Sequence, residues 1–253
     1  MPAPSQPVPA AKNHRTRTLA VCAAPVVALL VAAALVPLPF VIARPGSTTA
    51  NVLGEHKGKP VITINGTATR RTSGQLRMTT IEATGPNVDI SLADVVDGWF
   101  RTDRAVMPHD SVYPPGQSDE EIERHNVADM KKSQDAAAEA ALRYLHRSPK
   151  DVKVELSLAD VGGPSAGLLF TLGVIDKLDG DGRGGDLTGG RNIAGTGTIE
   201  PDGTVGAVPK DECSDASAEL PKGLRLIPVT ELKDAVASLK DLAAGKSVPS
   251  CPA

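Results

Sequence analysis

The hydrophobic pattern is dominated by one uninterrupted apolar segment near the N-terminus. Leu19 to Ala43 contains no charged residue, although Pro25, Pro37 and Pro39 interrupt it. A helix needs about 20 apolar residues to cross a bilayer, so this segment is long enough for a transmembrane anchor, which we place at residues 18–43. A cleaved signal peptide is the alternative, but its apolar core normally covers only about 7–15 residues.

The charges that flank this segment set its expected orientation. Residues 1–17 carry Lys12, Arg15 and Arg17 but no acidic residue. Basic residues beside an anchor tend to stay on the cytoplasmic side of the membrane. The sequence therefore predicts a cytoplasmic tail over residues 1–17, a single-pass anchor in the cell membrane, and an extracytoplasmic main domain.

Beyond the anchor, the pattern predicts a polar linker and then alternating strands and helices. The linker is expected at residues 44–60 and the domain at 61–248. Ser118 and Glu121 form a capping box at the start of one helix, and Thr230 is expected to cap the last helix. Alternating strands and helices indicate an α/β or α+β domain. The residue periodicity places strands at Val61–Ile64, Gly74–Ala83, Val152–Leu158 and Leu224–Val229, and helices at 118–146, Leu168–Leu178 and 230–244.

Composition excludes several classes of function. The chain has 27 basic and 30 acidic residues, a net charge of −3, which is too balanced for a protein that binds nucleic acid through a basic surface. Aromatic residues make up only 2%, so the core is expected to be aliphatic. No motif has the spacing of a zinc site, and the Gly/Asp-rich run 179–190 does not match a calcium loop. We therefore expect no metal, no cofactor and no nucleic-acid partner.

The three cysteines fit an extracytoplasmic domain. Cys22 lies within the apolar segment and is expected to act there as a small hydrophobic residue. Cys213 and Cys251 are available as a pair in an oxidising compartment, which favours a disulfide in the C-terminal region. Two unrelated free thiols are the alternative.

The segment GGPSAG at residues 162–167 is the motif that carries chemistry. It follows a predicted strand and opens a predicted helix. Ser165 therefore lies near a helix N-terminus, where free N–H groups can hold an oxyanion, and Gly163, Ala166 and Gly167 would form the turn. The alternative is that Ser165 only caps the helix. A nucleophile elbow of the α/β-hydrolase type is excluded because all five histidines precede Ser165 and none follows it.

Without a downstream histidine, a nucleophilic Ser165 needs another base. A lysine can serve if its pKa is lowered by desolvation. Lys177 lies on the same predicted helix, about 18 Å away at helical rise, and is too distant. The other downstream candidates are Lys210, Lys222, Lys233, Lys240 and Lys246.

At this point the sequence resembles a known family. GGPSAG after an alternating strand looks like the nucleophile motif of Lon-type proteases. Residues 189–199 and 202–206 resemble the segment that precedes the catalytic lysine of that family, and Thr196 matches a threonine that supports this lysine. Membrane-anchored Lon-like proteins of the YlbL type are the nearest resemblance, and its further matching segments are 72–76, 78–81, 113–117 and the helix containing Met130, Ser133, Gln134 and Ala137.

The resemblance implies a Lon proteolytic-domain-like fold, which is a ribosomal protein S5 domain 2-like α+β fold. It implies a serine-type endopeptidase with a Ser-Lys dyad that hydrolyses peptide bonds in a peptide or protein substrate. Lon-type domains commonly form rings, so a homo-oligomer is possible. The chain has no Walker motif, so no ATPase is expected within it.

Two departures from the family pattern leave the activity open. Residues 146–151 leave no room for the PDZ domain that relatives usually carry. The segment that normally bears the catalytic lysine breaks off after Val208 and continues directly into Pro209 and Lys210. Lys210 is then either a substitute base or a surface charge beside Asp211 and Glu212. Two functions remain: a membrane-anchored serine endopeptidase, or a catalytically degenerate domain that acts in binding or as a scaffold.

Overall fold

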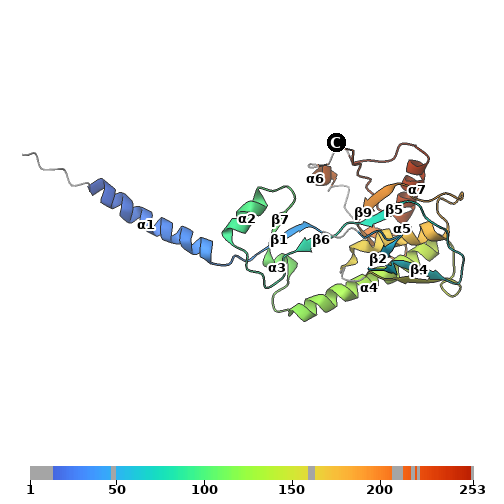
Figure 1. Cartoon of the computed structure of the whole chain (residues 1–253), viewed down its shortest axis with the longest axis horizontal. Helices are drawn as coiled ribbons and strands as arrows, with labels where there is room; N and C mark the ends of the chain where they lie inside the picture. The colour runs from blue at the N-terminus through green and yellow to red at the C-terminus, as the bar shows by residue number, and fades with distance from the viewer. Residues whose placement is uncertain are drawn as a thin grey trace, which may run out of the picture. The chain divides into compact units, whose positions relative to one another are not determined.

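The computed structural model describes residues 14–46, 50–158, 163–206, 213–217, 220 and 223–251. The chain divides into two compact units (Figure 1). The first unit contains Met1–Ala43 and Ala83–Val112, and the second contains Arg44–Glu82 and Tyr113–Ala253. Helices and small sheets are mixed in the chain, which agrees with the α+β class predicted from the sequence.

The first unit is a small helix and strand cluster. Strand β1 pairs with β7 antiparallel, with Phe40 opposite Pro108. Helix α2 begins at a complete capping box formed by Ser91 and Asp94. A small apolar cluster of Ile42, Ile90 and Val95 holds α2 on the strands. The elements are α1 (His14–Leu35), β1 (Phe40–Pro45), α2 (Leu92–Trp99), β7 (Ala105–Pro108) and α3 (His109–Val112).

The predicted anchor segment is helical over only part of its length. Helix α1 ends at Leu35, and Phe40 already belongs to strand β1, so the segment is not one helix to Ala43 as the apolar pattern suggested. Pro37 and Pro39 explain the change, because proline lacks the N–H that a continuing helix requires. In the part of the chain that the structure describes, no helix combines the length and hydrophobicity needed to cross a membrane.

The second unit is built around helix α5 (Gly167–Leu178), which packs against helix α4 (Asp119–Tyr144). Every residue of α5 except Lys177 is buried. Strand β4 pairs antiparallel with β8, and β5 pairs parallel with β9. The strands are β2 (Glu55–His56), β3 (Lys59–Pro60), β4 (Ile62–Asn65), β5 (Gln75–Met78), β8 (Lys153–Leu156), β9 (Asn192–Gly195), β10 (Thr198–Ile199) and β11 (Val205–Gly206), and the remaining helices are η1 (Pro164–Ala166), α6 (Cys213–Ser217) and α7 (Leu232–Ala243). Strand β6 (Ile81–Ala83) belongs to the three-stranded sheet with the order β6-β1-β7.

The strongest local signals of the sequence are confirmed. Helix α4 begins with the predicted capping box, in which Ser118 and Glu121 bond to each other's backbone N–H groups. Acidic residues in its first turn and Arg143 in its last complement the helix dipole. Helix α5 and strands β4 and β8 also form where their periodicity placed them.

Three predicted elements need correction. The strand expected over Gly74–Ala83 is two short strands, β5 and β6, that belong to different sheets. The strand expected over Leu224–Val229 does not form, and Pro228, which lacks a donor, lies within it. The last helix begins after Glu231 without a side-chain cap, and the backbone carbonyl of Thr230 instead accepts a bond from Val205.

The predicted linker is partly a core segment. Ala50, Val52 and Leu53 are buried in the main apolar cluster of the second unit, and residues 55–60 form the β2–β3 hairpin. Residues 44–60 are mostly polar, and the few apolar side chains among them show no clear period. The sequence pattern therefore did not indicate that these side chains are buried. The linker prediction is therefore wrong for residues 50–60.

The C-terminal region is closed by a disulfide. The sulfurs of Cys213 and Cys251 are 2.03 Å apart, and their Cα atoms are 5.3 Å apart. This is the pairing that the sequence favoured. Cys22 is a free, exposed cysteine on α1.

Candidate functional site

The candidate nucleophile Ser165 lies on a single 3₁₀ turn, η1, immediately before α5. Gly163 precedes the turn with a φ of 89° and a ψ of 159°, a conformation that strains any residue with a side chain. Pro164 occupies the first position of the turn, where its missing N–H costs nothing. The sequence Gly-Pro-Ser therefore reverses the chain sharply and presents Ser165 just ahead of a buried helix.

The turn is held by hydrogen bonds on both sides. The N–H of Gly163 donates to the carbonyl of Asn126 (3.2 Å), and the buried Ser133 hydroxyl donates to the carbonyl of Pro164 (2.8 Å). The N–H of Gly197 donates to the carbonyl of Ser165 (2.7 Å). These three bonds fix the backbone on either side of the Ser165 side chain to helix α4 and to the segment between β9 and β10.

Thr196 contributes a further contact to this turn. Its hydroxyl donates to the Ser165 carbonyl at 3.4 Å, next to the bond from Gly197. The family resemblance gives Thr196 a role in supporting a lysine. Its contact among the described residues is with the backbone of the candidate nucleophile, and Lys210 lies outside these residues.

Gly167 allows α5 to start in close contact with its neighbours. A Cβ at this position would lie 2.9 Å from Ile199 Cγ2 and 2.9 Å from Ser133 Oγ. It would also lie 3.1 Å from the backbone nitrogen of Ile199, which belongs to strand β10. The glycine thus keeps Ser133 close enough to hold the turn.

We expect Gly167→Ala to destabilise the fold by about 1–3 kcal/mol, because overpacking a tight interior forces neighbouring groups apart. The measurement is the midpoint of urea unfolding. Gly85→Ala is the matched control, since its added Cβ would meet only Val88 Cγ2 at 3.6 Å, an ordinary contact distance. Equal midpoints for the two variants would contradict the close packing at Gly167.

The Ser165 side chain is exposed, whereas Ala166 and Gly167 beside it are buried. Among the residues that the structure describes, none forms a hydrogen bond with the Ser165 hydroxyl. The first N–H groups of a helix lack intrahelical acceptors. Here the N–H of Leu168 donates to the carbonyl of Gly197 at 3.0 Å and the N–H of Gly167 donates to the carbonyl of Pro164, so Ser165 presents an exposed side chain at a helix start where these two donors are already engaged.

The described lysines downstream of Ser165 are engaged elsewhere. Lys233 pairs with Glu231 at 2.6 Å, and Lys246 pairs with Asp241 at 3.1 Å. Lys177 is half-buried on α5, and desolvation lowers its pKa. Lys240 acts electrostatically on Asp181. Lys210 and Lys222, the remaining candidates for a base, lie outside the described residues.

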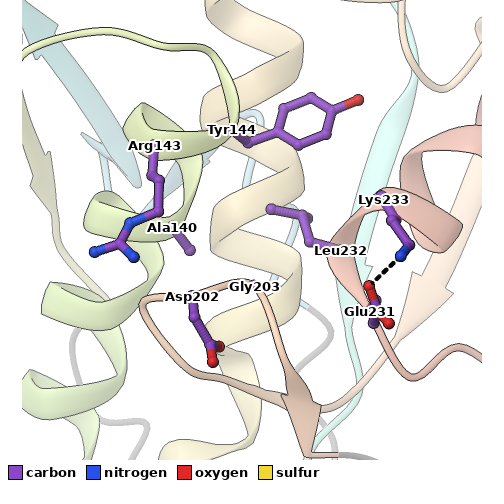
Figure 2. A pocket seen from close by; sticks show the side chains of 8 residues that line it. All are labelled: Ala140, Arg143, Tyr144, Asp202, Gly203, Glu231, Leu232 and Lys233. Atoms are coloured by element: carbon purple, nitrogen blue, oxygen red, sulfur yellow. Dashed lines mark ion pairs between the residues drawn. The ribbon is translucent and has the colours of Figure 1, made fainter.

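A surface pocket lies at the end of helix α4 (Figure 2). Its walls come from the C-terminal end of α4, the turn before β11 and the start of α7. Both of its cations have carboxylate partners, because Arg143 pairs with Glu139 at 2.9 Å and Lys233 pairs with Glu231. The lining residues are Ala140, Arg143, Tyr144, Asp202, Gly203, Glu231, Leu232 and Lys233.

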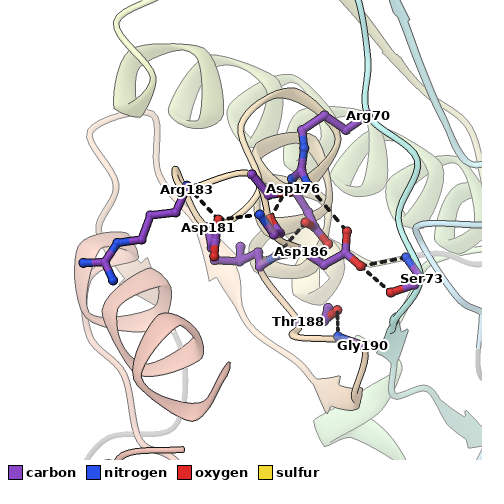
Figure 3. Close-up of polar contacts among 11 residues, drawn as sticks. Arg70, Ser73, Asp176, Asp181, Arg183, Asp186, Thr188 and Gly190 are labelled. Atoms are coloured by element: carbon purple, nitrogen blue, oxygen red, sulfur yellow. Dashed lines mark hydrogen bonds and ion pairs between the residues drawn. The ribbon is translucent and has the colours of Figure 1, made fainter. Parts of the chain in front are cut away.

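Helix α5 also carries a buried carboxylate that the sequence reasoning missed (Figure 3). Asp176 is fully buried; its Oδ1 accepts a bond from the N–H of Leu187 at 2.7 Å. Its Oδ2 has no hydrogen-bond partner among the described residues. Burial raises the pKa of Asp176 to about 6, and the nearby Asp186 adds to this effect. A single acid within the apolar run LLFTLGVID was the signal that could have identified it.

The loop that covers Asp176 is itself tied down by polar contacts. The Arg70 guanidinium donates to the carbonyls of Gly184 and Gly185 at 2.8 Å each, and lies 3.8 Å from Asp186. Asp186 also accepts bonds from the N–H and hydroxyl of Ser73. The Gly/Asp-rich run is therefore a structural loop, as the sequence indicated, and the described residues contain no cluster suited to a metal ion.

Comparisons with known proteins return nothing for this chain. No protein-family model matches it, no curated protein matches it, and no solved structure matches it.

Proposed function

We propose that this protein is a membrane-anchored serine endopeptidase of Lon-like type, with Ser165 as its nucleophile. The observation that carries the proposal is the exposed Ser165 hydroxyl on a turn whose flanking carbonyls are fixed by Ser133 and Gly197. A residue that served only as a helix cap would direct its hydroxyl to a backbone N–H, whereas the N-cap of α5 is Ala166 and no hydrogen bond among the described residues involves the Ser165 hydroxyl. In the same proposal, residues 18–43 hold the chain in the membrane with the second unit outside the cytoplasm.

The reaction needs one nucleophile, one base and one oxyanion site. The Ser165 hydroxyl loses its proton to the base and attacks the carbonyl carbon of a peptide bond. The C–N bond then breaks, the base returns the proton to the amine that leaves, and water hydrolyses the resulting ester. We assign the base to Lys210 as a substitute, because the segment that bears the catalytic lysine in the family breaks off after Val208 and Lys210 follows directly.

Covalent trapping tests the nucleophile directly. The full chain, in detergent, is incubated with an activated peptide ester, quenched in acid and digested for mass spectrometry. We expect the acyl group on the peptide that contains Ser165, and none on Ser157, an exposed serine at the end of β8. Acylation spread evenly over exposed serines would overturn the proposal.

The alternative function, a non-catalytic binding domain, is favoured by one observation. The described downstream lysines have partners or positions away from the Ser165 hydroxyl. Lys210→Ala decides between the two functions when compared with Lys222→Ala. Loss of acylation in the first variant alone assigns the base to Lys210. No acylation in the unmodified chain would favour the binding domain.

A further inference from the structure

Helix α2 of the first unit has an exposed apolar face. Val96, Trp99 and Phe100 are 41%, 66% and 86% exposed. Their spacing of three and four residues places them on the same side of the helix, so they form one surface. We call these three residues the aromatic face of α2.

The aromatic face is not a displaced part of the core. Helix α2 already buries another side, where Val95 belongs to the apolar cluster and Gly98 packs against Val106. A Cβ on Gly98 would lie 2.6 Å from Val106 Cγ2, so this side of α2 is tightly seated. The aromatic face therefore points away from the packing surface that holds the helix.

The aromatic face uses side chains that are rare in this protein. Trp99 is the one tryptophan of the chain, and Phe100 is one of three phenylalanines. Exposing a large aromatic side chain forgoes stabilisation that burial would provide. Two adjacent examples in a chain with 2% aromatic residues indicate a surface that contacts another phase or molecule.

In the proposed function, helix α1 of the same unit lies in the bilayer. Its described large apolar side chains are exposed, and they are distributed around the helix rather than along one stripe. The bilayer of the proposed function would surround such a helix with an apolar environment on all sides. The exposed side chains include Leu19 69%, Val21 73%, Val26 56%, Val27 56%, Leu29 70% and Val31 51%.

Helix α2 starts close to the point where the chain leaves α1. Leu38 follows the end of α1, and its N–H donates to the carbonyl of Ile90 at 2.8 Å. Ile90 directly precedes Ser91, the N-cap of α2. Helices α1 and α2 also contact one another. If α1 lies in lipid, α2 is held at the surface of the same bilayer.

The charges around the aromatic face fit a neutral lipid surface. Arg104 pairs with Asp97 at 2.8 Å, and Arg101 pairs with Asp103 at 2.8 Å. Each of these two cations thus has its own carboxylate, so neither is left as an unpaired charge for an anionic headgroup. Tryptophan and phenylalanine at the membrane–water boundary act through their apolar rings, and tryptophan is enriched there.

We propose that the aromatic face of α2 inserts into the interface of the bilayer that holds α1, so that Trp99 and Phe100 fix the first unit against the lipid surface. This inference rests on the anchoring part of the proposed function and is independent of any peptidase activity.

The single tryptophan makes the test specific. The full chain is reconstituted into phosphatidylcholine vesicles, and flotation shows whether it is held by lipid. Trp99 fluorescence is then measured with lipids brominated at different acyl depths and with iodide in the aqueous phase. We expect a blue-shifted emission, a loss of most of the signal to shallow brominated lipid, and protection from iodide.

A second reporter provides the control. Trp99→Phe combined with Leu224→Trp moves the tryptophan to an exposed position, 51% exposed, in the second unit. Its emission should remain accessible to iodide and unaffected by brominated lipid. Trp99→Ser with Phe100→Ser is expected to float with vesicles but to be extracted at lower detergent concentration than the unmodified chain.

Each outcome bears on a defined claim. Iodide access to Trp99 in a chain that floats with vesicles overturns the interfacial contact and leaves the anchor intact. A blue shift without quenching by brominated lipid shows that protein covers the aromatic face, and also overturns it. A chain that does not float overturns the anchor together with this inference, whereas Ser165 acylation remains a separate question.

Discussion

Ser165→Ala is expected to lower the rate of peptide-bond cleavage at least about 10³-fold, because removing a nucleophile eliminates the covalent route and leaves only binding and oxyanion stabilisation. The exposed hydroxyl makes no described hydrogen bond, so its loss should not disturb the packing of η1 against Ser133 and Gly197. The measurement is the initial rate of cleavage of an unfolded protein substrate by the full chain.

Ser157→Ala is the matched control for this effect. Ser157 is also exposed, and its backbone N–H, which the substitution keeps, donates to Val61 at 2.9 Å. The Ser157→Ala variant should therefore cleave the substrate at the same rate as the unmodified chain. Equal unfolding midpoints for the two variants would show that any difference in rate is chemical. Cleavage that persists in the Ser165→Ala variant would show that Ser165 is not the nucleophile.

The sequence predicted best those elements whose signals are local. Ser118 and Glu121 mark the start of α4 because a capping box depends only on residues within one turn. The turn before α5 follows from Gly163 and Pro164, whose backbone preferences are intrinsic. These signals do not depend on what packs nearby, and they locate Ser165 correctly on the chain.

Elements that depend on tertiary pairing were predicted less well. Gly74 to Ala83 has one continuous strand pattern, but β5 pairs in parallel with β9, which is distant in sequence, and the strand ends at Met78. Beyond it, Thr79 donates its N–H to the carbonyl of Gly195. Alternation of side chains specifies faces of a strand but not its partners, so the break was not visible in the pattern.

Site chemistry was predictable only in part, for the same reason. The GGPSAG motif identifies a candidate nucleophile, but the contacts of Ser133 and Thr196 with the turn cross large sequence separations. Asp176 was missed because a lone acid in an apolar run resembles an exposed helix position. Its burial depends on the loop that contributes Leu187, which the helix pattern does not reveal.

Asp176→Asn is expected to change how stability depends on pH. The folded-state pKa of Asp176 is raised from 3.8 to about 6, chiefly by burial and further by Asp186, with opposing effects from the Leu187 N–H, Arg70 and Lys177. Between these two values the folded state binds more protons than the unfolded state, so this group lowers stability as pH rises. The full effect is about 3 kcal/mol, complete above the folded pKa, and about 2 kcal/mol of it falls between pH 4.5 and 7.5.

Asparagine keeps an oxygen acceptor for the Leu187 N–H but has no charge to bury. Its contribution to the free energy of unfolding therefore does not change between about pH 4.5 and 7.5. The difference in unfolding free energy between Asp176→Asn and the unmodified chain should therefore shift in favour of the variant by about 2 kcal/mol from pH 4.5 to 7.5. Urea unfolding of the full chain in a neutral detergent measures this difference. Asp179→Asn, which removes an exposed acid at the end of the same helix, is the matched control. If the Asp176→Asn curve runs parallel to that of the unmodified chain, the carboxylate is not buried as a charge, and helix α5 must open to water at that point.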